Sequence, residues 1–305
     1  MTARTSISRT LWIAAVASAC ARTGPVRAQD LAIQSPGGLK LLVVAESPGA
    51  ALRIVPPGHA TSDRAVEVLF PEHVTAVRHG RTAGEQLYMF RGGLSGDRPA
   101  WRRVGRALEY ERDLPGPVHL LARAMLEEDG VRFHYEFSNH SGVAYDMIYA
   151  VTDPRLTSTF HDVRLERTYV HHADGFELLA SESPGRLTMP LDQWLPARYL
   201  ASFRWPVPAL RIERRTDGIT YYNKSRPVDQ PFIATLSADS AWVVASFARE
   251  AGNVWSNPEL TCQHVDPQTS LAPRGRATLE MKILVLRGSL DEALRRARSQ
   301  RASLQ

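Results

Sequence analysis

The sequence HLLARAML-EEDG-VRFHYEF, residues 119–137, carries the clearest indication of fold in the chain. Two runs with apolar alternation flank Asp129-Gly130, a dipeptide typical of hairpin turns because it accepts the positive φ angles that such turns need. Side chains alternate between the two faces of a strand, so one face of the second run is apolar and the other is polar. The apolar face contains Val131, Phe133, Tyr135 and Phe137. The stretch predicts an antiparallel hairpin with one buried face.

Similar short runs extend in both directions from this hairpin, from residue 38 to residue 287. Residues 143–150 predict another strand, and residues 167–180 predict a hairpin that turns at Asp174-Gly175. Residues 279–285 predict a strand near the C-terminus with one face in solvent. Irregular polar loops are expected between about residues 152 and 232. The pattern predicts an all-β fold, a large antiparallel β-sandwich over residues 29–288.

The last segment is the one strong helix prediction. Ser289-Leu-Asp-Glu292 is a capping box, in which each of the two end residues satisfies a backbone donor of the other. Apolar residues then follow helical spacing, and arginines occupy the other face. We expect a short amphipathic C-terminal helix over residues 289–305 that packs on the sheet. Contact with a membrane surface is the alternative.

Residues 1–28 resemble a secretory signal peptide. A charged start precedes the apolar run Leu11–Ala21, and Val26 and Ala28 occupy the small-residue positions of a cleavage site. The prediction is export to the periplasm or beyond, with cleavage after Ala28. The stretch that ends at Cys20 also resembles a bacterial lipobox, so a lipid anchor at Cys20 is the alternative. The apolar run is too short to span a bilayer, and no transmembrane segment is predicted.

Composition excludes several classes of protein. The chain has 305 residues, with 44% hydrophobic and 23% charged residues, as expected for a globular protein. Its formal charge is +5, but four of the positive charges are arginines of residues 1–28, which leaves +1 for the remainder. Net charge therefore gives no support to nucleic-acid binding. Without Cys20 the chain keeps only Cys262, so no intramolecular disulfide is expected, and Cys262 is predicted to be buried in a strand.

A C-terminal stretch resembles a known superfamily. Residues 257–267 read NPELTCQHVDP, residues 271–275 read LAPRG, and a predicted closing strand follows at residues 277–286. This order is similar to the C-terminal strands of the galactose-mutarotase-like superfamily, which includes aldose 1-epimerases, although Arg274 interrupts its Pro-Gly pair. The resemblance implies a sugar-binding β-supersandwich. It also implies relatives that include polysaccharide lyases.

One position departs from the epimerase pattern. In the epimerases the residue two positions after this cysteine is a glutamate that acts as the general base, and here that position is His264. Histidine can accept a proton near neutrality, but the change argues against simple sugar epimerisation. We predict that His264 faces the cleft and contacts residues 161–172 or 194–226. A neutral imidazole satisfied within the core is the alternative.

The densest polar stretch is FHDVRLERTYVHH, residues 160–172. Arg167, Tyr169 and His171 alternate onto one face of an extended strand. A cation, a phenol and an imidazole are suited to β-elimination from a uronate: the cation binds the carboxylate, and the other groups move protons. We therefore predict Arg167, Tyr169, His171 and His264 as catalytic residues. A purely structural ion network is the alternative.

Aromatic residues with polar neighbours suit the apolar faces and hydroxyl rims of sugars. The predicted substrate-binding residues are His161, Trp194, Arg198, Tyr199, Tyr222 and Lys224. Burial of Trp194 as an anchor for long loops is the alternative. His161, Asp162, His171 and His172 are acceptable metal ligands, but adjacent histidines on a strand face opposite ways and no zinc spacing is present. We predict no metal and no cofactor, since phosphate-binding and dinucleotide-binding motifs are also missing.

Two functions follow from these residues. The first is an exported carbohydrate-active enzyme, most concretely a lyase acting on an acidic, uronate-containing polysaccharide. The second is a non-catalytic carbohydrate-binding or periplasmic structural protein. In both cases the predicted partner is a polysaccharide or oligosaccharide. Convergence of acid, base and cation side chains in one concave pocket would favour the enzyme.

Overall fold

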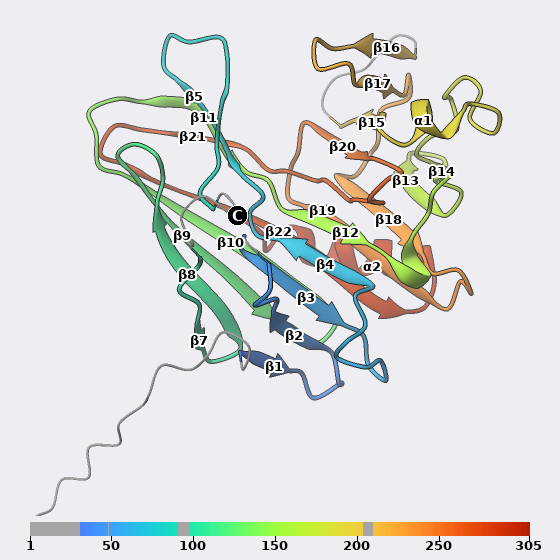
Figure 1. Cartoon of the computed structure of the whole chain (residues 1–305), viewed down its shortest axis with the longest axis horizontal. Coiled ribbons are helices and arrows are strands. Elements are labelled where there is room, and N and C mark those ends of the chain that lie inside the picture. Colours follow the sequence, from blue (N-terminus) through green and yellow to red (C-terminus); the bar gives the residue numbers. More distant parts are fainter. Residues whose placement is uncertain (1–30, 48, 91–97, 204–209) are drawn as a thin grey trace, which may run out of the picture.

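The computed structural model describes residues 31–47, 49–90, 98–203 and 210–305, which form four β-sheets and a C-terminal helix (Figure 1). The predicted all-β fold with large antiparallel sheets is confirmed. The predicted signal peptide, its cleavage after Ala28 and the alternative anchor at Cys20 lie outside the described residues. Within the described ranges, no helix has the length and apolar character needed to cross a membrane.

Two large sheets face each other. The five-stranded sheet has the order β1 (Ala32–Gln34), β2 (Lys40–Val43), β3 (Ala51–Val55), β4 (Val66–Leu69) and β12 (Asp153–Leu156). The nine-stranded sheet has the order β14 (Gly175–Leu178), β13 (Thr168–His172), β18 (Phe232–Leu236), β19 (Trp242–Ala248), β22 (Arg276–Arg287), β10 (Gly130–Asn139), β9 (Val118–Leu126), β8 (Ala107–Asp113) and β7 (Arg102–Val104).

Two smaller sheets lie at the upper end of the sandwich in the view of Figure 1. One has the order β21 (Thr269–Leu271), β11 (Tyr145–Ala150), β5 (Val74–Arg78) and β6 (Glu85–Leu87). The other has the order β16 (Arg211–Arg214), β17 (Thr220–Asn223), β15 (Arg198–Ser202) and β20 (Asn253–Ser256). The short helix α1 (Leu191–Trp194) precedes β15. The expectation of irregular loops over residues 152–232 is therefore partly wrong, because this region supplies strands to three of the sheets.

The hairpin predicted at residues 119–137 is confirmed as β9 and β10, with Val131 opposite Leu126. The reason for the glycine differs from the one expected. Gly130 does not have a positive φ, but a Cβ there would lie 2.0 Å from the carbonyl oxygen of Ile283. Gly130 is thus required by the close approach of β22 rather than by the turn.

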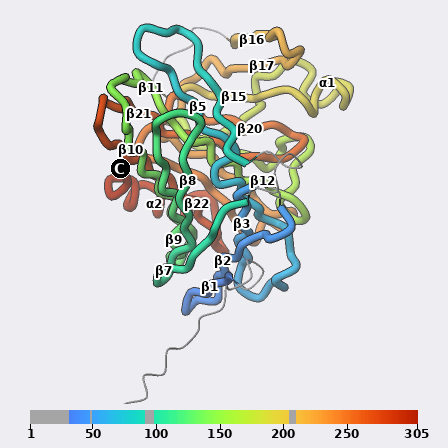
Figure 2. The backbone as a smooth tube through the Cα atoms, turned by 60° about the vertical axis from the view of Figure 1, so that its left-hand side comes forward, coloured from blue at the N-terminus to red at the C-terminus, as the bar shows by residue number. Residues whose placement is uncertain are grey.

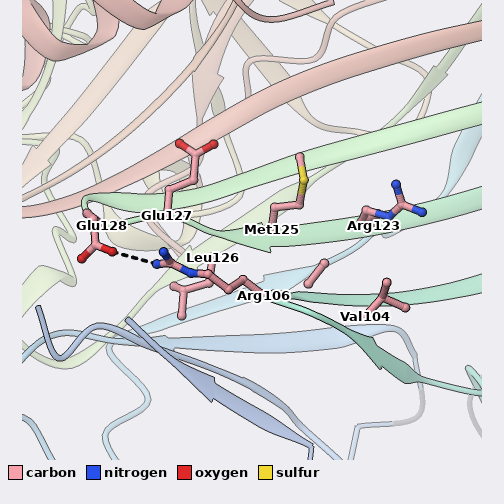
Figure 3. Close-up of a pocket in the computed structure, with 8 residues that line it drawn as sticks. Val104, Arg106, Arg123, Met125, Leu126, Glu127 and Glu128 are labelled. Atoms are coloured by element: carbon pink, nitrogen blue, oxygen red, sulfur yellow. Dashed lines mark hydrogen bonds and ion pairs between the residues drawn. The ribbon is translucent and has the colours of Figure 1, made fainter. Parts of the chain in front are cut away.

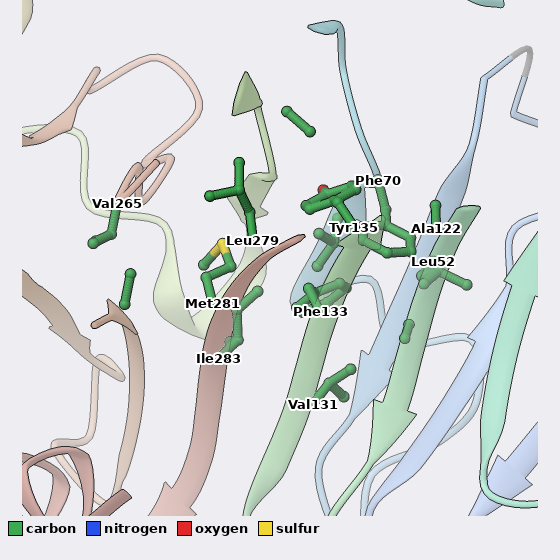
Figure 4. Close-up of a cluster of buried hydrophobic side chains, with 14 of the residues drawn as sticks. Leu52, Phe70, Ala122, Val131, Phe133, Tyr135, Val265, Leu279, Met281 and Ile283 are labelled. Carbon is green, nitrogen blue, oxygen red and sulfur yellow. The ribbon is translucent and has the colours of Figure 1, made fainter. Parts of the chain in front are cut away.

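The main core lies between the two large sheets (Figure 4). The predicted inner face of β10 is confirmed, since Phe133 and Phe137 are fully buried. Phe70 packs against Phe133 and Tyr135, with ring centroids 4.8 Å apart in both pairs. Each such side chain contributes on the order of 1.5–3 kcal/mol through burial of apolar surface.

The opposite face of β22 is also covered, so the prediction of a solvent face on this strand is wrong. Helix α2 (Leu290–Arg301) lies on that face and buries Ala293 and Leu294 against it (Figure 2). The predicted helix and its packing are confirmed, and Ser289 Oγ accepts a hydrogen bond from the Glu292 amide at 3.3 Å. The carboxylate of Glu292 instead accepts from Arg296, so only half of the predicted capping box is formed.

A buried lysine holds α2 to the sheet. Lys282 Nζ on β22 is within hydrogen-bonding distance of Glu127 (2.5 Å), Asp129 (2.6 Å) and Gln300 of α2 (2.6 Å). The amide of Gln300 also donates to Asp129 at 2.8 Å. This network compensates the charge of Lys282, which the alternating pattern placed on the solvent face of the strand.

We expect Lys282→Met to lower the free energy of unfolding by about 3 kcal/mol, because the carboxylates of Glu127 and Asp129 lose their buried cation. Urea unfolding at neutral pH measures this change. Lys40→Met on β2 is the control, with an expected change within about 0.5 kcal/mol. Equal stability of the Lys282 variant and the wild type would show that apolar packing alone holds α2.

Candidate functional site

A cleft of about 550 Å³ brings aromatic and titratable side chains from several segments together around one hollow. Its residues come from both small sheets and from the segments that join them to the sandwich. The β5–β6–β11 side supplies Glu72, His73, Gln86, Tyr88, Tyr149 and Val151. The β15–β17–β20 side supplies Arg198, Leu200, Arg215, Ile219, Tyr221, Gly252, Asn253 and Trp255, and the following loop supplies Asp266 and Gln268.

Trp255 forms an aromatic platform in the cleft. Its ring stacks on the imidazole of His264 with centroids 3.7 Å apart and planes 2° apart. The two residues also exchange backbone hydrogen bonds, of 3.1 and 2.9 Å, across an isolated β-bridge. The Arg198 guanidinium lies 5.7 Å from the Trp255 ring centroid. His264 therefore covers one face of the Trp255 ring, and the Arg198 guanidinium lies near the ring as a second positively charged neighbour.

A row of charged groups lies under this platform. His264 Nε2 is 3.2 Å from Asp153 Oδ1, and His264 Nδ1 is 3.5 Å from Asp266 Oδ2. Arg155 donates to Asp153 Oδ2 at 2.5 Å and lies 3.2 Å from Glu72. The row thus alternates in sign from Glu72 to Asp266, and its last carboxylate lines the cleft.

The charges in this row stabilise one another. Burial alone would lower the pKa of His264, but Cys262, Asp153 and Asp266 outweigh it and hold that pKa well above its ordinary value of 6.5. Burial would raise the pKa of Asp153, but His264 and Arg155 hold it below its ordinary value. The structure therefore favours a buried imidazolium between two carboxylates.

Two residues of the cleft have buried polar atoms without a hydrogen-bond partner among the described residues. These atoms are Nδ1 of His73 and Oδ1 of Asp266. The nearest ionic neighbour of His73 Nδ1 is Glu72 Oε2, at 3.7 Å. An unsatisfied buried polar atom costs about 1–3 kcal/mol, and because neither atom is open to solvent, a ligand hydroxyl would recover this cost only after a movement of the lining.

Tyr149 brings a phenol to the same cleft. Burial raises its pKa and outweighs the lowering effect of the Thr75 hydroxyl; the negative charge of Asp266 adds to the rise, and His264 and Arg215 lower the pKa. The phenol therefore keeps its proton at neutral pH. In chemical terms Tyr149 is a potential proton donor, and Asp266 is a potential proton acceptor.

Three buried groups of the row offer metal-ligand atoms. Atoms of Asp153, Cys262 and His264 lie within 4.8 Å of one another. Arg155 and the imidazolium already balance the charges of Asp153 and Asp266 at this point. The geometry thus accounts for these groups as an ion network, and we assign no metal to them.

The contacts predicted for His264 are wrong. The imidazole is 2% exposed and pairs with Asp153 and Asp266 rather than with residues 161–172 or 194–226. The segment around it is not the predicted strand, because only the bridge to Trp255 is formed. The predicted burial of Cys262 is confirmed, at 1% exposure. His264 supports the floor of the cleft and does not face into it.

The proposed catalytic face on β13 does not reach the cleft. Arg167 donates to the carbonyl oxygens of Thr159, Leu236 and His161, which uses its guanidinium to join three segments. His171 Nδ1 pairs with Asp229 at 2.7 Å, and its ring packs on Phe176. Tyr169 is half-buried on the same strand. This geometry agrees with the structural alternative for Arg167 and His171.

The predicted substrate-binding residues separate into two groups. Arg198 lines the cleft, as expected for a binding residue. The others do not line it: Trp194 is fully buried and donates to the carbonyl of Val163 at 2.7 Å, and His161 lies beside Arg167. Tyr199 is fully buried between Trp194 and Tyr222. The structure thus agrees with the alternative that Trp194 anchors the loops.

Lys224 is also buried, at 2% exposure. Its Nζ lies 2.9 Å from Glu177, 3.6 Å from Glu182 and within hydrogen-bonding distance of Ser181. These contacts tie the segment after β17 to the segment after β14. The amino group has no position in the cleft, so its prediction as a substrate ligand is not supported by this geometry.

Sequence reasoning missed most of the cleft. His73, Tyr149 and Trp255 stand in separate strands or loops, and none belongs to a dense polar stretch. Asp266 could have been predicted, because it lies two residues after His264 in the stretch that resembles the superfamily. Alternation from His264 would have placed Asp266 on the same side of the chain.

A second hollow, of about 540 Å³, lies at the ends of β8 and β9. Figure 3 shows Arg106 and Glu128 joined across it, and their ion pair measures 2.9 Å. Glu127 at its rim already binds Lys282. Among the described residues that line this hollow, none has a buried side-chain atom without a hydrogen-bond partner of the kind found at His73 and Asp266. The cleft over Trp255 is therefore the stronger candidate.

Comparison with known proteins gives a likeness of fold. No family model and no curated protein matches the chain. A galactose mutarotase-like protein from Lactobacillus casei is 14% identical, with 84% of this chain and 99% of that chain covered and a TM-score of 0.48. A galactose mutarotase related enzyme from Lactobacillus acidophilus is 11% identical, with 84% and 97% covered and a TM-score of 0.44.

A putative aldose 1-epimerase from Escherichia coli is 11% identical, with 84% of this chain and 98% of that chain covered and a TM-score of 0.39. The chain is similar in fold to galactose mutarotase-like proteins. At these identities the likeness concerns the fold alone.

The buried imidazolium predicts a pH dependence of stability. The unfolded chain releases the His264 proton near the ordinary pKa of 6.5, whereas the folded protein keeps it. The contribution of His264 is therefore complete below that pH and declines as pH rises toward the raised pKa, by up to about 1.4 kcal/mol per pH unit. Urea unfolding of the wild type between about pH 6 and pH 8 measures this slope.

His264→Gln should be less stable by about 3 kcal/mol at pH 6, because Asp153 loses one of its two cations and Asp266 loses the imidazolium, and its stability should lack this slope. His79→Gln, which removes an exposed partner of Asp146, is the matched control and should keep the slope. A wild-type stability that does not decline over this range would contradict the raised pKa of His264 in the folded protein.

Proposed function

We propose that the cleft over Trp255 binds a carbohydrate and that the protein is an exported carbohydrate-active enzyme that moves a proton on the bound sugar. The observation that carries the proposal is the aromatic platform of Trp255 in one cleft with Tyr149, Arg198 and Asp266. Sugars present apolar C–H faces to aromatic rings and hydroxyl groups to polar atoms. The cleft offers both kinds of contact at once.

Each cleft residue has a distinct role in this proposal. Trp255 supports the sugar ring, and His73 binds a hydroxyl. Asp266 accepts a proton from the sugar, and the charged row behind it, through His264 and Asp153, fixes its position. Tyr149 donates a proton, because its raised pKa keeps the phenol protonated.

On a uronate polymer, the substrate predicted from the sequence, these groups would perform β-elimination. Asp266 takes the proton from C5, the electron pair forms the C4–C5 double bond, and the C4–O bond breaks. Tyr149 gives its proton to the leaving oxygen. In this proposal Tyr149 supplies the predicted phenol, and Asp266 takes the place of the predicted imidazole of β13.

Binding without turnover is the second candidate. The observation in its favour is His264, which occupies the position of the epimerase glutamate by resemblance and is sealed beneath Trp255. In that case the charged row is a structural support. Sugar would then bind in the same cleft and leave unchanged.

The test is incubation with a panel of uronate and neutral oligosaccharides, followed by ¹H NMR, which detects both a new alkene proton and exchange of anomers. Asp266→Asn should reduce turnover by about 100-fold or more, because it removes the proton acceptor while keeping the shape of the side chain. Asp146→Asn on β11 is the control and should retain wild-type turnover. Undiminished turnover in the Asp266 variant would contradict the assignment, and binding without any product would favour the second candidate.

A further inference from the structure

The cleft continues into a second pocket of about 300 Å³. Leu200, Arg215, Tyr221 and Asn253 line both spaces, so the two are adjacent along one wall. The residues that line only the second pocket are Arg211, Glu213 and Asn223, which come from β16 and β17. Both volumes fall within the range of about 300–1,000 Å³ that is typical of small-molecule sites.

The second pocket has more positive than negative charge. Arg211 donates to Glu213 at 2.6 Å, and Arg215 lies 3.5 Å from the same carboxylate. Two guanidinium groups therefore share one acid, which leaves one positive charge uncompensated within the lining. Both arginines are more than half exposed, so their remaining donors are open to an arriving anion.

Aromatic and amide groups fix the position of these donors. The Arg215 guanidinium lies 3.8 Å from the centroid of the Tyr221 ring, in cation–π contact. Asn223 is held by its amide hydrogen bond to Ser202 at 3.1 Å. On the wall of the first space, Arg198 donates to the carbonyl oxygens of Pro196 and Ala197 rather than to a carboxylate. The charge thus extends along one side of the whole cleft.

We infer that the second pocket is an anion subsite, in which Arg211 and Arg215 bind the carboxylate or sulfate group of a sugar unit next to the one over Trp255. The substrate is then an acidic glycan of at least two units. Guanidinium groups recognise carboxylate and sulfate oxygens through paired N–H donors. This inference rests on the proposed function and adds to it the charge and the minimum length of the glycan.

The test is calorimetric titration of the full protein with four probes: galacturonic acid, oligogalacturonates of two to four units, chondroitin sulfate oligosaccharides and neutral cello-oligosaccharides. An oligogalacturonate or a sulfated oligosaccharide should bind at least tenfold more tightly than the monosaccharide and the neutral probe. Binding of the oligogalacturonate identifies the anion as carboxylate, and binding of the chondroitin sulfate oligosaccharide without the oligogalacturonate identifies it as sulfate.

Arg211→Gln tests binding in the second pocket alone, because Arg211 lines that pocket and not the cleft over Trp255. It should weaken binding of the acidic oligosaccharide about tenfold and leave binding of the monosaccharide unchanged. Arg103→Gln on exposed β7 is the matched control and should bind as the wild type does. Thermal unfolding of both variants should match the wild type, since both side chains are exposed.

The outcomes distinguish the inference from the function on which it rests. If Arg211→Gln binds the acidic oligosaccharide with wild-type affinity, or if the neutral probe binds as tightly as the acidic ones, the anion subsite is wrong and the sugar cleft stands. If no probe binds to the wild type, the proposed function is wrong and the subsite is wrong with it.

Discussion

A strand that is apolar on both faces needs cover on both faces, and β22 imposes this constraint on the whole molecule. Met281 and Ile283 face the five-stranded sheet, and Leu284 and Leu286 face α2. Because both faces lose contact with water, the polar groups on this strand must find partners inside the protein. Lys282 does so with Glu127, Asp129 and Gln300, which also ties the last helix to the sheet.

Buried charges are also compensated by one another beneath the cleft. The two small sheets meet above the sandwich, and their meeting point is supported by charged groups of alternating sign rather than by apolar packing alone. His264 is central to this row, since it touches the carboxylate of β12, the carboxylate of the cleft and the ring of Trp255. A group that looked like a catalytic base in the sequence is therefore a support for the groups that border the sugar space.

The sequence predicted the parts of the fold that depend on local patterns. The alternation in β9 and β10, the turn at Asp174-Gly175 and the capped helix α2 each have a short-range signature that survives in the folded chain. The solvent face assigned to β22 is wrong because the pattern predicts that the last helix packs on the sheet but does not say which strand face it covers. The site failed for a related reason: His73, Tyr149, Trp255 and Asp266 are far apart in the chain. The catalytic residues were predicted instead in the dense polar stretch at residues 160–172, where Arg167 donates its hydrogen bonds to backbone carbonyl oxygens.

The central claim is that sugar binds over Trp255, beside His73 and Asp266. The most direct measurement is a crystal structure of the protein soaked with the tightest-binding acidic oligosaccharide. The account predicts one sugar ring on the Trp255 face, with hydroxyl groups within hydrogen-bonding distance of Asp266 and His73. Density for the oligosaccharide at the hollow beside Arg106 and Glu128, with the cleft unchanged, would contradict it.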